Sequence, residues 1–136
     1  RDVLIVDDYA HHPSEISATI EAAKVCQRSR LFVVFQPHRY TRTKLLMDRF
    51  GASFIKCDNL IITDVYAAGE APIEGGSAQD LAQRVRQDAK VPVEYVAKEN
   101  LLGFLKKSVR QDDLVLFLGA GDITKISDEF SKNFQK

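Results

Sequence analysis

VLIVDDYAHHPSEISATI, residues 3–20, contains the order of elements that decides the fold of this chain. The run from Val3 to Val6 is continuously apolar, as a strand buried on both faces of a sheet requires. A polar loop follows, and then Ile16 and Ile20 stand four residues apart, which is the spacing of one face of a helix. The stretch therefore predicts a strand, a loop and a helix in succession.

The same succession recurs along the chain. Four further apolar runs have the length of strands: Leu31 to Phe35, Leu60 to Thr63, Val93 to Val96 and Leu114 to Leu118. The apolar stripes of the expected helices are Ile16, Ile20, Ala23 and Val25; Leu45, Leu46 and Phe50; Leu81, Ala82 and Val85; Leu101, Leu102 and Leu105; and Ile123, Ile126 and Phe130. This alternation predicts an α/β, doubly wound, Rossmann-like fold, with a mainly parallel sheet of about five or six strands and helices on both faces.

Length and charge narrow the class of protein. With 136 residues, of which 45% are hydrophobic, the chain is the size of one domain. Its 19 basic and 19 acidic residues cancel, so no long-range field favours nucleic acid or an anionic membrane. No apolar run approaches the roughly 20 residues needed to span a bilayer, and the N-terminus lacks the pattern of a signal peptide. We therefore expect a cytoplasmic protein.

Two smaller features of the sequence lead to expectations about the domain organisation and the cysteines. The chain enters a strand almost at once and has no initiator Met, so we expect residues 1–136 to be a single domain excised from a longer chain. Cys26 and Cys57 are isolated from one another, without the Cys-x-x-Cys spacing, and are expected to be buried free thiols.

Four of the five loops that follow the expected strands are rich in polar, aromatic and charged residues. They are DDYAHHPSE (7–15), QPHRYTRT (36–43), TDVYAAGEAP (63–72) and GAGDITK (119–125), whereas residues 97–100 are plain. In a parallel sheet these loops leave the same edge, where ligands of such folds bind. The sequence therefore predicts one binding site at the carboxyl ends of the strands.

The first loop allows more than one interpretation. Pro13 suits the first position of a helix, and Glu15 suits the positive end of the helix dipole. His11 and His12 are adjacent, so their side chains point apart and do not match the spacing of metal ligands. No metal site is expected. The loop is either a helix-capping turn with solvated histidines or a ligand loop in which Asp8 accepts hydrogen bonds from hydroxyl groups.

The second loop predicts an anion site. Arg39 and Arg42 are three residues apart where a helix should begin, so both guanidinium groups can lie on one face near exposed backbone amides. Such a pair suits a carboxylate or a phosphate. A solvated basic turn is the alternative. From the third loop, Asp64, Tyr66 and Glu70 are candidates to line the same cleft.

The last loop carries a weaker signal. GAGDI lacks the third glycine of the dinucleotide-binding motif, and the chain has no G-x-x-x-x-G-K-[ST] sequence with which to grip a triphosphate. Gly119 and Gly121 therefore serve either close backbone packing or contact with a ligand.

Four stretches, DDYAHHPSE, FQPHRYTRT, DVYAAGEAPI and LFLGAGDI, together resemble the C-terminal domain of the bacterial Mur ligases over essentially all 136 residues. The DDYAHHP element is shared in looser form with the folylpolyglutamate synthetases, whereas QPHRYTRT with DVYAAGEAP is specific for the alanine-adding branch. The resemblance implies a three-domain cytoplasmic ligase of peptidoglycan synthesis. This enzyme joins L-alanine to UDP-N-acetylmuramate through an acyl phosphate made from ATP. The chain would be the third domain alone, inactive by itself, and the missing N-terminal and central domains would hold the UDP-sugar, the P-loop and Mg²⁺.

The resemblance also implies roles for individual residues. Asp8 would lie near the ATP ribose, and His11 near the phosphates and the incoming amino acid. Arg39 and Arg42 match the basic pair associated with the amino-acid carboxylate. Because an imidazole titrates near neutrality, His11 is also our hypothesis for the catalytic proton acceptor. The remaining residues expected to contact substrates are Tyr9, His12 and Tyr66.

Two other functions remain as alternatives. The first is a stand-alone module that binds a nucleotide or another anion at the same edge of the sheet. The second is the related ligase that recycles an intact tripeptide, which we expect to depart from QPHRYTRT in its second loop.

Overall fold

The computed structural model describes residues 2–134 and contains one five-stranded sheet in which every strand pairing is parallel. The strands are β1 (Leu4–Asp8), β2 (Arg30–Phe35), β3 (Asn59–Ile62), β4 (Val93–Tyr95) and β5 (Asp113–Leu118). The helices are α1 (Pro13–Lys24), α2 (Tyr40–Leu45), α3 (Met47–Ser53), α4 (Ala78–Ala89), α5 (Lys98–Ser108) and α6 (Ile123–Phe134). The strand order β1-β5-β2-β3-β4 confirms the predicted α/β class.

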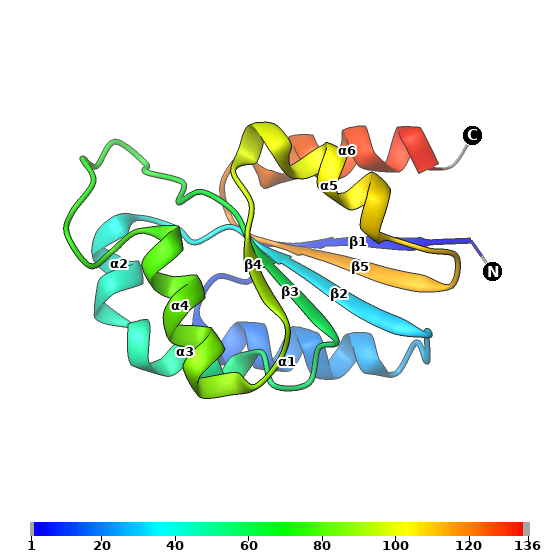
Figure 1. The fold of residues 1–136 in the computed structure, drawn as a ribbon, viewed down its shortest axis with the longest axis horizontal. Coiled ribbons are helices and arrows are strands. Elements are labelled where there is room, and N and C mark those ends of the chain that lie inside the picture. The colour runs from blue at the N-terminus through cyan, green and yellow to red at the C-terminus, as the bar shows by residue number, and fades with distance from the viewer. Residues whose placement is uncertain (1, 135–136) are drawn as a thin grey trace.

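Helices cover both faces of the sheet, as predicted. Figure 1 shows α5 and α6 on one side and α1, α3 and α4 on the other. The central strand β2 serves both layers, because alternate side chains of a strand point to opposite faces. Leu31, Val33 and Phe35 pack toward α1, α3 and α4, whereas Phe32 and Val34 pack toward α5 and α6. The continuous apolar run in the sequence is therefore explained by burial on two faces.

Strand β1 forms one edge of the sheet and extends further than the sequence predicted. Asp7 and Asp8 belong to the strand, paired in register with Phe117 and Leu118 of β5, rather than to the loop. An edge strand tolerates carboxylates at its end because they reach solvent. Asp7 accepts a hydrogen bond from the hydroxyl of Ser127 in α6 at 2.7 Å, and partial burial raises the pKa of this carboxyl.

Three details of the sequence interpretation were wrong. The single helix expected after β2 is divided at Leu46 into α2 and α3, and Leu45, assigned to its apolar stripe, is 78% exposed. Val25 is equally exposed because it follows the last residue of α1. Cys26 lies in the exposed turn beyond that helix, so only Cys57 is a buried thiol, and burial raises its pKa to about 12.

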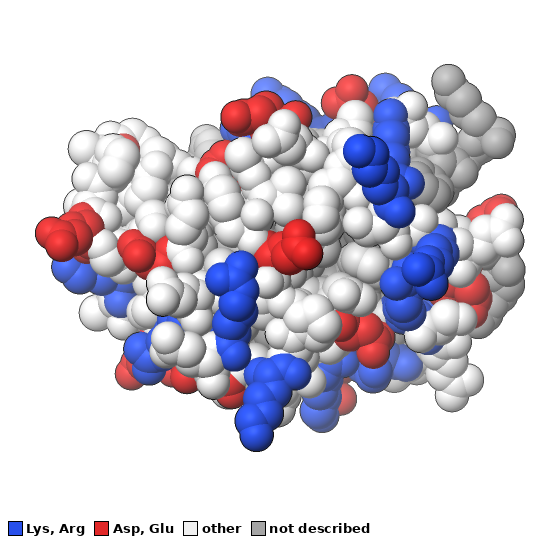
Figure 2. Space-filling view, in the orientation of Figure 1, with Lys and Arg blue, Asp and Glu red and all other residues white. Residues whose placement is uncertain are grey.

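The surface reflects the balanced charge of the chain. On the face drawn in Figure 2, basic and acidic side chains are interspersed among uncharged ones. None of the helices within residues 2–134 is long and apolar enough to cross a membrane.

Candidate functional site

The loops predicted to form a site do converge, at the edge of the sheet formed by the carboxyl ends of the strands. The last residues of four strands are in register: Asp8 pairs with Leu118, Leu118 with Phe35, and Phe35 with Ile62. The loops after β1, β5, β2 and β3 therefore leave the sheet at the same level. Strand β5 enters between β1 and β2, so the chain reverses its winding there, which is where sheets of this class bind ligands.

Three aromatic rings from three loops form a row across this edge. The rings of His11 and His38 have centroids 5.4 Å apart, and those of His38 and Tyr66 are stacked with centroids 5.6 Å apart. The row joins the loops that follow β1, β2 and β3. His11 and Tyr66 were both predicted to be site residues, and the structure brings them together through His38.

His38 is the residue of this row that the sequence analysis did not select. Burial lowers the pKa of His38, and the electrostatic effects of the neighbouring His11, Arg42 and Arg39 lower it further. The ring is therefore held in its neutral form. Its buried Nδ1 atom has no hydrogen-bond partner among the described residues. The only signal in the sequence was its place between a buried strand and Arg39.

The two adjacent histidines of the first loop differ in their hydrogen bonds. The Nδ1 of His11 lies 3.0 Å from the carbonyl oxygen of Tyr9, and because a carbonyl only accepts, this nitrogen carries the proton. Nε2 is then the nitrogen of this ring that can accept a proton. In His12, by contrast, Nδ1 accepts the backbone N–H of Ser14 at 3.2 Å and caps helix α1. His11 thus has the tautomer of a proton acceptor, and His12 has a helix-capping function.

The remaining residues of this loop support its shape. Glu15 accepts the backbone N–H of His12 at 3.1 Å, which completes a capping box at the start of α1, where Pro13 and Glu15 were expected to begin a helix. Asp8 accepts the backbone N–H of Ala10 through Oδ1 at 2.9 Å, and its Oδ2 makes no hydrogen bond to the described residues. Tyr9 is 72% exposed. A polar turn with one open carboxylate oxygen and one exposed ring therefore borders the site.

Arg39 and Arg42 line a cleft of about 370 Å³ beside this turn. Its other walls are His12, Thr41, Leu45 and Leu46, so the first and second loops both contribute. Neither guanidinium forms an ion pair with a residue in the described part of the chain. Two guanidinium groups in one cleft suit a carboxylate or a phosphate, so this geometry is compatible with the anion site expected from the sequence, which stays a prediction.

The third loop is fastened to the second. Arg39 donates its backbone N–H to the carbonyl of Tyr66 at 2.8 Å, and Tyr66 donates its own to the carbonyl of Pro37 at 2.8 Å. Glu70 accepts hydrogen bonds from the backbone N–H and the hydroxyl of Thr41, at 3.1 and 2.6 Å. These contacts, first from the hydroxyl, lower the pKa of Glu70. The backbone N–H of Thr41, the second residue of α2, is therefore occupied by Glu70.

A polar network holds the loops after β3 and β5. Asp64 accepts the hydroxyl of Tyr95 and, at 3.0 Å, the backbone N–H of Lys98. The ammonium group of Lys98 lies 2.8 Å from Asp122, whose other oxygen accepts the side-chain amide of Gln36 at 2.6 Å. The hydrogen bond from the ammonium group of Lys98 to Asp122 raises the pKa of Lys98. Asp64 thus fixes the start of α5 rather than lining the arginine cleft.

The glycines of the last loop serve close packing. A Cβ on Gly121 would lie 2.4 Å from the Cγ of Tyr66 and 2.7 Å from the Oε1 of Gln36. A Cβ on Gly119 would lie 3.2 Å from the Cβ of Gln36. Of the two roles considered for these glycines, the geometry supports close packing, of Gly121 against Tyr66 of the third loop and of Gly119 against Gln36.

Metal ligands are not grouped in this part of the protein. Within residues 2–134 no cluster of three or more His, Cys, Asp or Glu side chains has the arrangement of a metal site.

Comparison with known proteins gives a consistent family assignment. Residues 1–121 match the family model described as "Mur ligase, glutamate ligase domain". The chain is 47% identical over 133 residues to the UDP-N-acetylmuramate–L-alanine ligase of Geotalea uraniireducens, covering 94% of this chain and 28% of that protein. It is 45% identical over 135 residues to the enzyme of the same name from Geotalea daltonii, covering 98% and 30%.

A solved structure gives the same result. The crystal structure of UDP-N-acetylmuramate-alanine ligase from Thermotoga maritima matches with a TM-score of 0.73 and 27% identity, covering 98% of this chain and 27% of that one. The chain spans 27 to 30% of the length of these three proteins.

Proposed function

We propose a function from the premise that this chain belongs to the Mur ligase family, in which it matches the glutamate ligase domain. The proposed function is that of the carboxyl-terminal domain of a cytoplasmic, ATP-dependent ligase that joins L-alanine to UDP-N-acetylmuramate in peptidoglycan synthesis. The observation that carries the proposal is the identity of 45 to 47%, over 94 to 98% of the chain, with proteins named for this reaction.

The proposal assigns different tasks to different parts of the longer protein. The chain has no P-loop, so we assign the triphosphate of ATP and the UDP-sugar to domains outside it. The described residues also lack a cluster of metal ligands, so Mg²⁺ is assigned to no site here. This domain, inactive alone, would supply the groups that meet L-alanine and part of ATP. Asp8, with one carboxylate oxygen open, is the proposed contact for a ribose hydroxyl.

Arg39 and Arg42 are the proposed site of the alanine carboxylate. Both line one cleft and neither is neutralised by an ion pair among the described residues. A charge-assisted hydrogen bond contributes about 1.5–3 kcal/mol, so the pair can both hold the amino acid and orient its amine. His12 borders the same cleft, whereas Tyr9 and Tyr66 are proposed to close the site around the substrate.

His11 is the proposed proton acceptor. Its Nδ1 is held by the carbonyl of Tyr9, which leaves Nε2 as the nitrogen that can accept a proton. When the amine of alanine attacks the acyl phosphate of the muramoyl group, a C–N bond forms, the bond from carbon to the phosphate oxygen breaks, and phosphate leaves. The proton lost by the amine would pass to Nε2 of His11.

The test is a ligation assay with the full-length protein. We expect ADP and phosphate to form only when UDP-N-acetylmuramate, L-alanine and ATP are all present, and mass spectrometry to show the alanyl product. Ligation of an intact tripeptide without ligation of alanine would assign the recycling reaction instead. Nucleotide binding with no ligation would support the stand-alone module. Either of these results overturns the proposal.

A further inference from the structure

The long loop between β3 and α4 lies along the helix that carries the basic pair. Figure 1 shows this loop arching beside α2 before it turns back into α4. It begins with a short parallel bridge between His38 and Tyr66. At its far end Gly76 packs so closely on α2 that a Cβ there would lie 2.6 Å from the carbonyl oxygen of Tyr40. The loop thus contacts the second loop and α2 at more than one point.

The N-terminus of helix α2 lacks a side-chain cap of its own, and a residue of the long loop provides the missing hydrogen bonds. Its N-cap residue is Arg39, which provides no capping hydrogen bond from its side chain and has a φ of +68°, in the left-handed region that favours glycine. A residue held in such a conformation costs of the order of 1 kcal/mol and depends on its surroundings to keep it there. Glu70 supplies the missing cap, through its two hydrogen bonds from Thr41.

These contacts bear directly on the basic pair. Thr41 lies two residues after Arg39 and immediately before Arg42. The hydrogen bond from its backbone N–H to Glu70 therefore restrains the backbone that connects the two arginines. The carbonyl of Arg39 also accepts the backbone N–H of Thr43 at 3.1 Å, which anchors the turn from the other side. The charge of Glu70 is attracted by that of Arg39.

We propose that Glu70 is a positioning residue of the amino-acid site, which acts through Thr41 on Arg39 and Arg42. The inference rests on the proposed function, since it assigns the basic pair to the alanine carboxylate. Glu70 itself touches no substrate. It orders the turn from which both arginines project.

The test is a double-mutant cycle on the full-length ligase, with the KM values for L-alanine and ATP as readouts. Glu70→Ala removes both hydrogen bonds, and Thr41→Val removes only that of the hydroxyl. We expect Glu70→Ala to raise the KM for L-alanine about tenfold and Thr41→Val to raise it less, with the KM for ATP changed less than about twofold. Because both residues act through one contact, the double variant should be no worse than Glu70→Ala alone. Glu70→Gln, which keeps an acceptor oxygen, should recover part of the loss.

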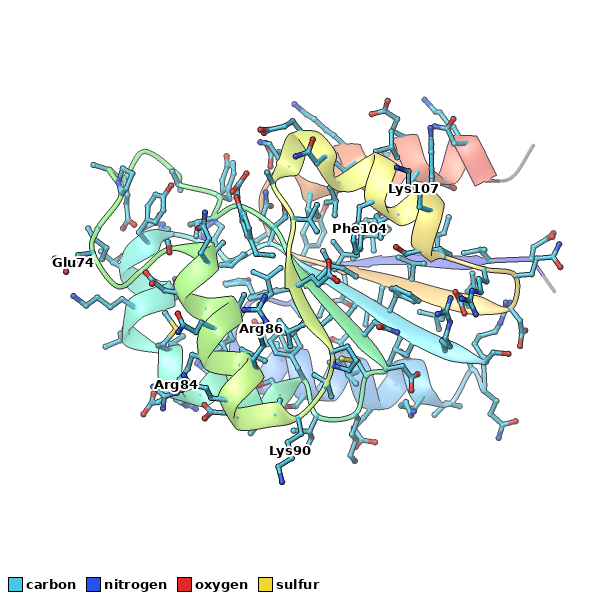
Figure 3. All side chains as sticks on the ribbon, in the orientation of Figure 1. Glu74, Arg84, Arg86, Lys90, Phe104 and Lys107 are labelled. Atoms are coloured by element: carbon cyan, nitrogen blue, oxygen red, sulfur yellow. The ribbon has the colours of Figure 1, made fainter. Side chains whose placement is uncertain are left out.

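A matched control is available in the same loop. Glu74 is exposed, and Figure 3 shows its side chain at the outer tip of the loop, pointing away from the rest of the molecule. Glu74→Ala removes the same charge without removing a contact to α2, so both KM values should remain at the wild-type level.

Three results would overturn the assignment of Glu70. They are an unchanged KM for L-alanine in Glu70→Ala, an equal rise in both KM values, and strictly additive effects in the cycle. All three require a wild-type enzyme that ligates alanine. Failure of the wild-type protein to form ADP in an alanine-dependent way would instead reject the proposed function itself. The two failures are therefore distinguishable.

Discussion

Gly121→Ala is expected to destabilise the domain because this glycine lies where the loops after β3 and β5 meet. The added methyl group would lie 2.4 Å from the Cγ and 2.8 Å from the Cβ of Tyr66, and 2.7 Å from the Oε1 of Gln36. The contacted atoms of Tyr66 are next to the backbone and cannot turn away. Gln36 is fixed by its bonds to Asp122 and to the backbone N–H of Ile123. Overpacking of this kind costs about 1–3 kcal/mol, whereas the loss of glycine's freedom in the unfolded chain returns about 0.4–1 kcal/mol.

The net expectation is a loss of about 1–2 kcal/mol in the free energy of unfolding, measured from urea denaturation of the chain at an unchanged m value. Gly103→Ala is the matched control. Gly103 lies inside α5, and a Cβ there would meet nothing within 4 Å. Alanine should stabilise this helix by about 0.5–1 kcal/mol. The two identical substitutions thus have opposite expected signs. A neutral or stabilising Gly121→Ala would refute the close approach of the third loop to the last.

Three further predictions concern other parts of the chain. In the full-length ligase, His11→Ala should lower kcat about 100-fold or more, whereas an unchanged kcat would reject His11 as the base. In the native chain a thiol reagent should modify exposed Cys26 and spare Cys57, which is buried with a pKa of about 12; equal rates for both thiols would contradict the packing around α3. The raised pKa of Asp7 means that the folded state binds its proton more tightly than the unfolded state does, so stability falls as pH rises above about 4. Denaturation curves should therefore show Asp7→Asn gaining stability relative to the wild type as the pH rises above about 4, and parallel pH dependences would exclude this.

The fold could be predicted because its signals are local. Strands β2 and β5 are central in the sheet, so their runs of apolar residues are unbroken and easily recognised. The errors fall where exposure depends on tertiary position. Asp7 and Asp8 are strand residues only because β1 is an edge strand, and Leu45 is exposed because it ends α2 beside the arginine cleft. Neither fact is encoded in the spacing of neighbouring residues.

The candidate site could be located from the sequence but not assembled from it. The rule that ligands bind at the carboxyl ends of parallel strands selected loops that do lie together in the structure. It did not reveal the stack of His38 on Tyr66, or the hydrogen bonds of Glu70 to Thr41, 29 residues away. Such pairs depend on the register between strands and on the path of a long loop. The assigned roles of Asp8, His11, Arg39 and Arg42 remain predictions.

The most direct test of the central claim is the kinetics of Arg39→Ala in the full-length ligase, with the KM for L-alanine compared with that for ATP. Loss of one charge-assisted contact of about 1.5–3 kcal/mol should raise the KM for L-alanine roughly 10- to 150-fold and leave that for ATP within about twofold. An equal rise in both values would contradict the claim, because it would mean that the basic pair binds phosphate rather than the carboxylate of the amino acid.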